Sequence, residues 1–426
     1  MRDMPVANGP FIETNSAHSA ASPRWLSIVG IGEDGVDGLS AAARGLIGGA
    51  DIVIGGRRHL ALAAPLIRGA ARAWPSPFDG AADEVSRHRG RQVCVLASGD
   101  PFHYGVGAVL ARHVDPREMI VLPAPSAFSL AAARLGWSVP DTVRLSLHGR
   151  SLDLIRPHLQ PGARMLVLTS GGDGPAALAR LLAQSGFGQS RLTVLEALGG
   201  PRERVRGTTA GDFAFGAVDA LNTLAIEIEA APDARILPRT AGIPDELFEH
   251  DGQISKREIR AVVLSSLAPR RGELLWDIGS GSGAIAIEWM LSDPTMRAIA
   301  IERRGDRAAR IVRNAAACGG PALQVIAAAA PGALATLPKP DAIFIGGGAS
   351  EPGVVDTAAR ALRSGGRLVA NAVTVAGEAR LFEWQTEYGG MLSRIAVSRA
   401  QRRGAHLLWR ALAPVTQLAA VKGADR

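Results

Sequence analysis

The sequence predicts two α/β domains in tandem, each built around a largely parallel sheet. In both halves of the 426 residues, short apolar runs that end in glycine or polar residues alternate with helix-like stretches. Such alternation is typical of parallel sheets covered by helices. The pattern restarts after residues 230–244, a stretch with three prolines and little periodicity, and the two halves share neither glycine pattern nor length. Two different domains are therefore expected.

The N-terminal half follows a disordered leader expected at residues 1–23, which lack a basic segment followed by an apolar one. Apolar runs predict strands over 25–32, 50–54, 92–97, 119–122, 143–147, 164–169, 191–197 and 223–228. Helices are expected over 40–48, 105–113, 126–135 and 176–184. The predicted boundaries are 24–230 for this domain and 231–241 for the linker.

The C-terminal half, predicted to span 242–426, opens with a helix over 255–267. Ser255 is its expected N-cap, and Glu258 stands at the capping-box spacing. Further helices are expected over 284–291, 307–318 and 354–362. Strands are expected over 273–278, 298–302, 323–327, 342–345 and 367–371, and two strand-like runs, 392–398 and 405–411, are expected to end the chain.

Composition limits the function classes. The net charge is +7, and arginine supplies nearly all of the positive charge, so an anionic partner is expected: nucleic acid, a membrane surface or a polyanionic small molecule. Two cysteines cannot build a disulfide framework or a thiolate metal site, and they are expected to be small buried hydrophobes. With no secretory signal and no apolar run near the ~20 residues that span a bilayer, a cytoplasmic protein without a membrane partner is expected.

A glycine loop connects a predicted strand to a predicted helix. It reads Asp277-Ile-Gly279-Ser280-Gly281-Ser282-Gly283. Glycines allow a tight turn and a close approach of the backbone to a ligand at the helix N-terminus. The spacing is G-x-G-x-G rather than the dinucleotide pattern, and it suits S-adenosylmethionine, whose ammonium Asp277 could meet. Glu302 ends the next predicted strand, where its oxygens could accept both ribose hydroxyls. A ligand-free turn and a nicotinamide site are the alternatives.

The C-terminal half resembles the class I methyltransferases of corrin synthesis. The resemblance covers most of 238–426 and rests on five segments: Gly242–Phe248, Ile254–Arg260, Leu275–Gly283, Asp341–Gly347 and Asn371–Thr374. It implies a Rossmann-like fold, methylation at C15 and decarboxylation of the C12 acetate. The implied cofactor contacts are Gly279–Gly283, Glu302, Ser255, which replaces a commoner threonine, and Ala330, which precedes a proline.

The N-terminal half, over about 24–230, resembles the tetrapyrrole methylases, a class III fold of two α/β subdomains. The similar segments are Val29–Gly35, Leu96–Gly105, Pro123–Ser126 and Gly200–Val205. The implied cofactor contacts are Ser98, Gly99, Asp100, Ser126 and Ser170. Where that family has G-x-G-P-G, this chain has Glu33 and Asp34 after Gly32, so the resemblance leaves contact through this loop open.

A chain that combines these two domains resembles the decarboxylating C5,15-methyltransferases of cobalamin synthesis. They imply two S-adenosylmethionine sites, methylation of precorrin-6Y at C5 and C15 with loss of the ring C acetate carboxyl, and precorrin-8 as product. A tetrapyrrole with many carboxylates would explain the many arginines, which could bind it. A cationic cluster is therefore expected to face a cleft: Arg202, Arg204 and Arg206, or Arg303, Arg304, Arg307, Arg310 and Arg313.

Several points stay open at this level. No catalytic base and no metal are assigned, and the proton that replaces the lost carboxyl could come from His250, Asp251 or His148. An RNA methyltransferase is an alternative, although lysine is scarce, only two tyrosines occur, and no nucleic-acid partner is expected. A single active site with a non-catalytic tetrapyrrole-binding N-terminal half is another. A homo-oligomer is expected because exposed sheet edges in both families commonly pair.

Overall fold

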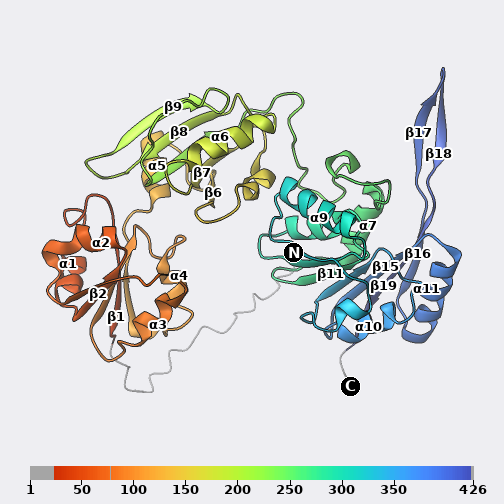
Figure 1. The fold of residues 1–426 in the computed structure, drawn as a ribbon, viewed down its shortest axis with the longest axis horizontal. Helices are drawn as coiled ribbons and strands as arrows, with labels where there is room; N and C mark the ends of the chain where they lie inside the picture. Colours follow the sequence, from red (N-terminus) through yellow and green to blue (C-terminus); the bar gives the residue numbers. More distant parts are fainter. Residues whose placement is uncertain (1–23, 77, 424–426) are drawn as a thin grey trace, which may run out of the picture. The chain divides into compact units, whose positions relative to one another are not determined.

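The computed structural model describes residues 24–76 and 78–423, and the chain divides into two compact units (Figure 1). The first unit is the chain up to Asp141, joined by Val194–Arg206 and Val218–Thr223. The second unit holds Thr142–Thr193, Gly207–Ala217 and everything from Leu224 onward. The leader expected at 1–23 lies outside the described residues, and the segment expected as a linker, 231–241, belongs to the second unit.

The first unit contains a five-stranded parallel sheet with the order β3-β2-β4-β1-β5. Its strands are β1 (Leu26–Ile31), β2 (Ile52–Gly55), β3 (Ala70–Ala73), β4 (Val93–Ser98) and β5 (Met119–Leu122). The helices are α1 (Ala41–Gly48), α2 (Arg57–Ala63), α3 (Ala81–Ser86), α4 (Val106–Leu110) and α5 (Ala127–Leu135). Strand β1 is buried along its whole length, which explains its nearly continuous apolar run. The helix expected over 105–113 is shorter: α4 ends at Leu110, and the turn that follows has 3₁₀-type bonds from Arg112 to Val109 and from His113 to Leu110.

A second sheet has the order β6-β7-β10-β8-β9. Its strands are β6 (Val143–Ser146), β7 (Arg164–Leu168), β8 (Arg191–Glu196), β9 (Arg204–Thr209) and β10 (Asn222–Glu227), and α6 (Gly174–Gln184) follows β7. The sequence did not predict β9. This strand is at an edge of the sheet and holds only exposed or half-buried residues, so it lacks the apolar signal of a core strand.

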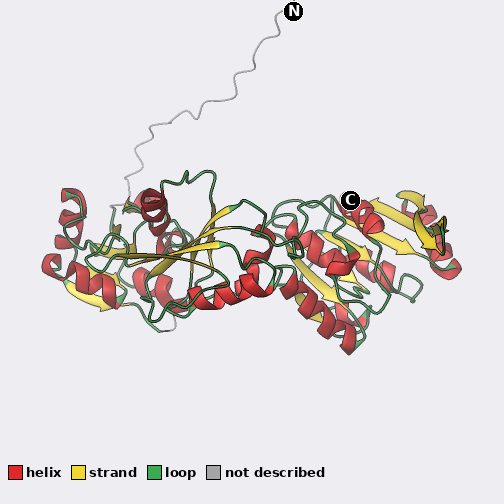
Figure 2. Cartoon of the chain, turned by 90° about the horizontal axis from the view of Figure 1, so that it is seen from above, coloured by secondary structure: helices red, strands yellow, loops and turns green. Residues whose placement is uncertain are grey.

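The third sheet lies in the second unit and has the order β13-β12-β11-β14-β15-β19-β16. Its strands are β11 (Leu274–Ile278), β12 (Arg297–Ile301), β13 (Gln324–Ile326), β14 (Ala342–Ile345), β15 (Arg367–Ala372), β16 (Met391–Ile395) and β19 (Val415–Val421). Helices lie on both sides of this sheet (Figure 2), and an apolar cluster packs each face. One face packs α7 (Arg257–Leu267), α8 (Ala284–Leu291) and α9 (Gly305–Ala317); the other packs α10 (Val354–Ala361) and α11 (Val375–Tyr388).

The two strand-like runs expected at 392–398 and 405–411 overlap β16 and β18, but the expectation that they end the chain is wrong. Strands β17 (Ser398–Arg403) and β18 (His406–Ala411) form a separate antiparallel hairpin that projects from the sheet (Figure 1). The last strand is β19, which lies antiparallel between β15 and β16. Its sequence, Val-Thr-Gln-Leu-Ala-Ala-Val, is too weakly patterned to predict an inserted strand.

The capping box expected at Ser255 is also wrong. Helix α7 begins at Arg257, and its N-cap residue is Lys256, whose side chain makes no cap hydrogen bond. The carboxylate of Glu258 instead accepts from Arg399 at 2.6 Å and 3.1 Å. A fork-to-fork ion pair of this kind is stronger than the hydrogen bond to a backbone amide that the capping box offers.

Candidate functional site

In the second unit, the glycine loop leaves β11 at the carboxyl edge of the sheet. Gly279, Gly281 and Gly283 all have positive φ, a backbone conformation that favours glycine. A Cβ on Gly279 would lie 2.6 Å from the carbonyl oxygen of Gly347, in the loop after β14. From β11 the chain runs first to β12 and β13 on one side, and later to β14 on the other. The loop therefore lies at the switch point where open α/β sheets bind ligands.

Asp277, the last residue but one of β11, is almost completely buried. Its Oδ2 accepts from the Ser280 hydroxyl at 2.7 Å and from the Ala286 amide at 3.2 Å. Its Oδ1 is buried without a hydrogen-bond partner among the described residues. Burial raises the pKa of this carboxyl from 3.8 to about 6, with a smaller contribution from Glu302. A buried oxygen without a donor is suited to a cationic ligand group.

Glu302, directly after β12, is also buried. Its Oε2 accepts from the Gly281 amide at 2.9 Å, and its Oε1 accepts from the Arg304 amide at 3.0 Å. Both oxygens thus bond to the backbone, where the sequence predicted ribose hydroxyls. Because each carboxylate oxygen has a second lone pair, Glu302 can hold the glycine loop and still accept from a ligand.

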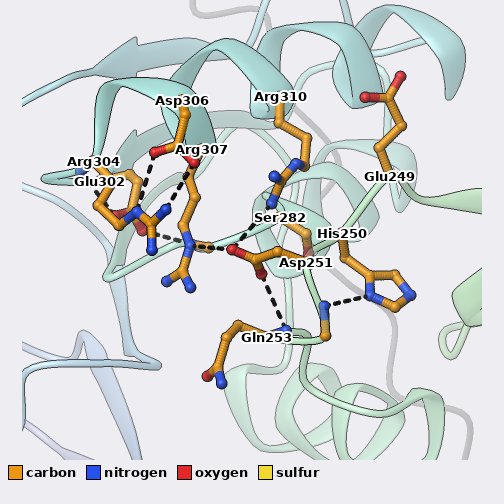
Figure 3. Close-up of polar contacts among 12 residues, drawn as sticks. Glu249, His250, Asp251, Gln253, Ser282, Glu302, Arg304, Asp306, Arg307 and Arg310 are labelled. Atoms are coloured by element: carbon orange, nitrogen blue, oxygen red, sulfur yellow. Dashed lines mark hydrogen bonds and ion pairs between the residues drawn. The ribbon is translucent and has the colours of Figure 1, made fainter.

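Residues 249–253, here called the cover loop, lie against the glycine loop (Figure 3). Asn314 of α9 joins the two: its Nδ2 donates to the carbonyls of Glu249 and Ser282, each at 2.9 Å. Asp251 binds two arginines of the same helix, α9, with Oδ2 2.8 Å from Arg307 Nε and 3.4 Å from Arg310 Nη1. His250 Nδ1 accepts the Gly252 amide at 3.0 Å. Asn314 is not among the residues that were predicted from the sequence.

A buried arginine of α7, from the Ile254–Arg260 segment, joins this helix to α8 and to the segment before the cover loop. Arg260 is fully buried, with Nε 2.7 Å from Glu288 Oε1 and Nη1 2.6 Å from Asp245 Oδ1. Glu288 also accepts the amides of Gly242 and Ile243. Two of the segments that carry the sequence resemblance, Gly242–Phe248 and Ile254–Arg260, are thus joined to α8 by one ion-pair network. Ser255 lies beside it, and its carbonyl accepts from Arg260.

Ala330, the remaining predicted residue of this half, is half-buried before Pro331. It packs against the apolar cluster that also contains Ile278 and Ile345, from the ends of β11 and β14.

In the first unit, three loops converge at the carboxyl edge of the sheet. A Cβ on Gly30 would lie 1.9 Å from the carbonyl oxygen of Gly99, and a Cβ on Gly99 would lie 2.7 Å from that of Pro125. The Ala124 amide donates to the Gly99 carbonyl at 3.1 Å. The predicted residues Ser98, Gly99, Asp100 and Ser126 therefore lie at one edge, where parallel sheets bind ligands.

The side chains at this edge already have partners. Asp100 Oδ1 accepts the Phe102 amide at 2.8 Å. Ser126 is the N-cap of α5, with its hydroxyl 3.2 Å from the Ser129 amide. The Ser98 hydroxyl is 2.8 Å from both Arg58 and His59 of α2, two residues that the sequence did not single out.

Ser170 and His148 belong to the second unit. Ser170 Oγ accepts the Gly149 amide at 2.8 Å, and His148 Nδ1 is 3.4 Å from the Thr169 carbonyl oxygen. Ser170 thus orders the turn after β6.

Comparisons with known proteins agree with this geometry. Residues 26–214 match the family model described as Tetrapyrrole (Corrin/Porphyrin) Methylases, and residues 246–422 match the one described as Precorrin methyltransferase domain. Over 410 residues the chain is 58% identical to a precorrin-6Y C(5,15)-methyltransferase (decarboxylating) from Sinorhizobium sp, covering 96% of this chain and 99% of that protein. This chain belongs to the precorrin-6Y C5,15-methyltransferase family.

Shorter relatives match parts of this C5,15-methyltransferase family member. One is a probable cobalt-precorrin-6B C(15)-methyltransferase (decarboxylating) from Pyrobaculum calidifontis, 35% identical, covering 41% of this chain and 93% of that protein. Another is a cobalt-precorrin-7 C(5)-methyltransferase from Salmonella typhimurium, 30% identical, covering 42% of this chain and 88% of that protein. Each is comparable in length to one half of the chain.

The arginines of this C5,15-methyltransferase family member are extensively paired. Arg204 and Arg206 bind Glu196, and Arg202 binds Glu33 and Asp219. In the second cluster, Arg304 binds Asp306 and Arg313 binds Glu249. Exposed Arg303 has no ion pair or hydrogen bond among the described residues. Much of the positive charge is therefore compensated within the protein.

Among residues 24–76 and 78–423, no helix has the length and hydrophobicity to cross a bilayer. In the same residues, no group of three His, Cys, Asp or Glu is arranged to hold a metal ion. Both cysteines are buried, and burial raises the pKa of the Cys94 thiol to about 12.

Proposed function

We propose that the protein methylates precorrin-6Y at C5 and C15 with S-adenosylmethionine as donor, removes the carboxyl of the ring C acetate, and releases precorrin-8. The observation that carries this proposal is the glycine loop beside the buried, unpartnered oxygen of Asp277. An ammonium at that oxygen, with a ribose against Glu302, is the arrangement that an S-adenosylmethionine site requires. The full-length relative of the same reaction supports the substrate.

Two cofactor sites and a division of labour belong to the same proposal. The half at 242–426 carries C15 methylation and decarboxylation, with Ser255, Asp277, Gly279–Gly283, Glu302 and Ala330 at its cofactor site. The half at 24–230 carries C5 methylation, with Ser98, Gly99, Asp100, Ser126 and Ser170. Family models that match 26–214 and 246–422 support these boundaries. Relatives with a single activity, each comparable in length to one half, support the division.

Methyl transfer requires the protein mainly to position the methyl donor and the substrate. A sulfonium is already electrophilic, and a methine carbon of a reduced tetrapyrrole is nucleophilic, so alignment can supply up to about 7–11 kcal/mol of the barrier. Decarboxylation leaves its electron pair on the conjugated macrocycle, and a proton then replaces the carboxyl group. Of the proton donors expected from the sequence, His250 and Asp251 lie in the cover loop.

The proposal includes arginines as the residues that bind the substrate's carboxylates, and a homo-oligomer as the assembly. An RNA substrate is the second candidate class, and the net charge of +7 is what favours it. Salt dependence separates the two, because many phosphate contacts give a steep loss of affinity with rising salt.

The test uses the full chain with precorrin-6Y, S-adenosylmethionine and mass spectrometry of the product. Wild type adds two methyl groups and loses one carboxyl group. Asp277→Asn slows C15 methylation and decarboxylation selectively, and Asp100→Asn slows C5 methylation selectively. Calorimetry counts two donor molecules per chain. One bound donor, or variants that lose the wrong methyl group, would overturn the division of labour. An unmodified tetrapyrrole would overturn the function.

A further inference from the structure

An aromatic cluster in the first unit lies on the loop that leaves β4. The loop runs from Asp100 to Gly105 and carries Phe102, His103 and Tyr104 in succession. Phe102 is 48% exposed and Tyr104 is 50% exposed, so two large rings meet solvent at the edge of the sheet where the cofactor is proposed to bind. Exposed apolar rings at such a place indicate a contact surface.

The backbone of this loop forms a tight turn. The Phe102 amide donates to Asp100 Oδ1 at 2.8 Å, and the Gly107 amide donates to the Pro101 carbonyl at 2.9 Å. A Cβ on Gly105 would lie 2.5 Å from the same Pro101 oxygen, so a side chain at this position would collide with the backbone. The rings after Asp100 are therefore carried by a loop that its own hydrogen bonds hold closed.

Tyr104 has a backbone conformation that a bulky residue disfavours. Its φ is +58°, in the left-handed region. Within residues 24–76 and 78–423, the other non-glycine residues with positive φ are Ala197 and Ala268, so Tyr104 is the bulky residue of the three. Backbone strain of this kind clusters at binding and active sites, because it persists only where the surrounding structure maintains it.

Two neighbouring rings hold the ring of Tyr104. Its centroid lies 5.5 Å from that of His103, with the planes 21° apart, and 6.0 Å from that of Phe128, with the planes 60° apart. The centroids of His103 and Phe128 are 4.7 Å apart. Phe128 is buried in α5, two residues after Ser126, so the cluster joins the β4 loop to the helix start that carries another predicted cofactor contact. The exposed ring is thus anchored on a buried one.

The chemistry of the proposed substrate suits this surface. A conjugated macrocycle has flat apolar faces and carries its carboxylates at the rim, and an aromatic side chain stacks on such a face. Methyl transfer requires the reacting carbon to be aligned with the methyl group, so the macrocycle must be held in one plane beside the donor. Tyr104 follows Asp100 by four residues, so its Cα lies within about 14 Å of this proposed donor contact.

We propose that Tyr104 is a substrate-binding residue of the N-terminal half: the exposed face of its ring stacks against the tetrapyrrole macrocycle during C5 methylation. The strained backbone keeps the ring on its two aromatic neighbours with half of the residue exposed. The inference rests on the proposed function, since it assumes that this half methylates C5.

The experiment uses the full chain, in which C15 methylation is an internal reference. Tyr104→Gly removes the ring at a backbone conformation that suits glycine, and Tyr104→Phe keeps the ring. Initial rates of both methylations are measured against precorrin-6Y and against S-adenosylmethionine. Tyr104→Gly raises the KM for the tetrapyrrole in C5 methylation about tenfold, as expected for the loss of one aromatic stacking contact. Its KM for S-adenosylmethionine and its C15 methylation stay unchanged, and Tyr104→Phe behaves as wild type.

Glycine at a second position of positive φ is the matched control. Ala268, the C-cap of α7, has a φ of +44°, so Ala268→Gly relieves the backbone there without removing a ring. This control leaves both methylations unchanged. The two KM values distinguish substrate binding from support of the fold, because a distorted N-terminal half would bind both the tetrapyrrole and the methyl donor less well.

The outcomes separate this inference from the function on which it rests. Wild type that fails to methylate C5 overturns the proposed function. Wild type that methylates C5, together with a Tyr104→Gly variant of unchanged KM for the tetrapyrrole, overturns the inference alone. A raised KM for S-adenosylmethionine in that variant would assign the ring to the cofactor, and a changed particle mass by light scattering would assign it to an interface between copies of the chain. Either result also overturns the inference.

Discussion

At the scale of single residues, the two proposed sites place acidic groups in opposite situations. Asp277 is buried with one oxygen unpartnered, whereas Glu33 is shielded by two arginines. The first arrangement costs stability in the absence of a cationic ligand, and the second does not. Residues that are unfavourable for the fold and favourable for a ligand mark functional sites.

Asp277→Asn is expected to stabilise the ligand-free protein above pH 6. The folded pKa is about 6 against an ordinary 3.8, so the folded protein holds this proton more tightly than the unfolded chain. Stability therefore falls as the pH rises through this window, and the asparagine removes a cost of about 1–3 kcal/mol. Thermal unfolding between pH 5 and pH 8 measures it.

The affinity for S-adenosylmethionine should fall in the same variant whose stability rises. Asp277→Asn weakens S-adenosylmethionine binding at the C-terminal site about tenfold or more by calorimetry, because a charged partner is lost. Asp341→Asn is the control, since its Oδ2 accepts the Leu274 amide at 2.9 Å, away from the glycine loop. A stabilised Asp277→Asn variant with unchanged affinity would remove Asp277 from the site.

His59 predicts a second pH effect, of opposite sign. Its folded pKa is about 4 against an ordinary 6.5, so the unfolded chain takes up a proton that the folded chain refuses. The free energy of unfolding should fall as the pH drops from 6.5 to 4. The melting temperature of wild type relative to His59→Gln is expected to decrease between pH 7 and pH 5. A constant difference would show that His59 titrates normally.

At the scale of elements, the buried Arg260 joins α7, α8 and the segment before them. Arg260→Met leaves Glu288 and Asp245 without their cation in a buried place, and it should destabilise the C-terminal half by about 3–5 kcal/mol. Urea unfolding followed by circular dichroism measures this. The double variant Arg260→Met with Glu288→Gln should recover part of the loss, and a double variant less stable than the single one contradicts the network.

At the scale of the whole molecule, the hairpin β17–β18 exposes apolar side chains that have no role within its own unit. Leu407, Leu408 and Trp409 are exposed, Trp409 by 78%. A two-stranded hairpin alone is marginal in water, and exposed apolar groups on it indicate a contact surface. The proposed homo-oligomer gives this surface a partner.

Replacing Trp409 by aspartate tests that assignment. The expected result is a smaller particle by light scattering, because a charge in an apolar contact is costly, with C15 methylation retained. Arg402→Ser, on the same exposed hairpin, is the control. An unchanged particle mass for Trp409→Asp would separate the hairpin from assembly.

The sequence by itself determined the features that depend on neighbours along the chain. The glycine loop at 279–283, with its strand and helix, and the alternation of strands and helices follow from local periodicity and from the conformational freedom of glycine, and the structure confirms them. The resemblance also led to the family.

Only the tertiary structure decided what depends on residues far apart in sequence. Strand β19 lies between two strands that precede it, and Glu258 pairs with Arg399 instead of capping its helix. The contacts of Ser98 with Arg58, and of Arg58 with Glu33, join three separate loops. Periodicity carries no signal for such pairs, because a side chain's partner is set by which strand ends meet at the edge of the sheet.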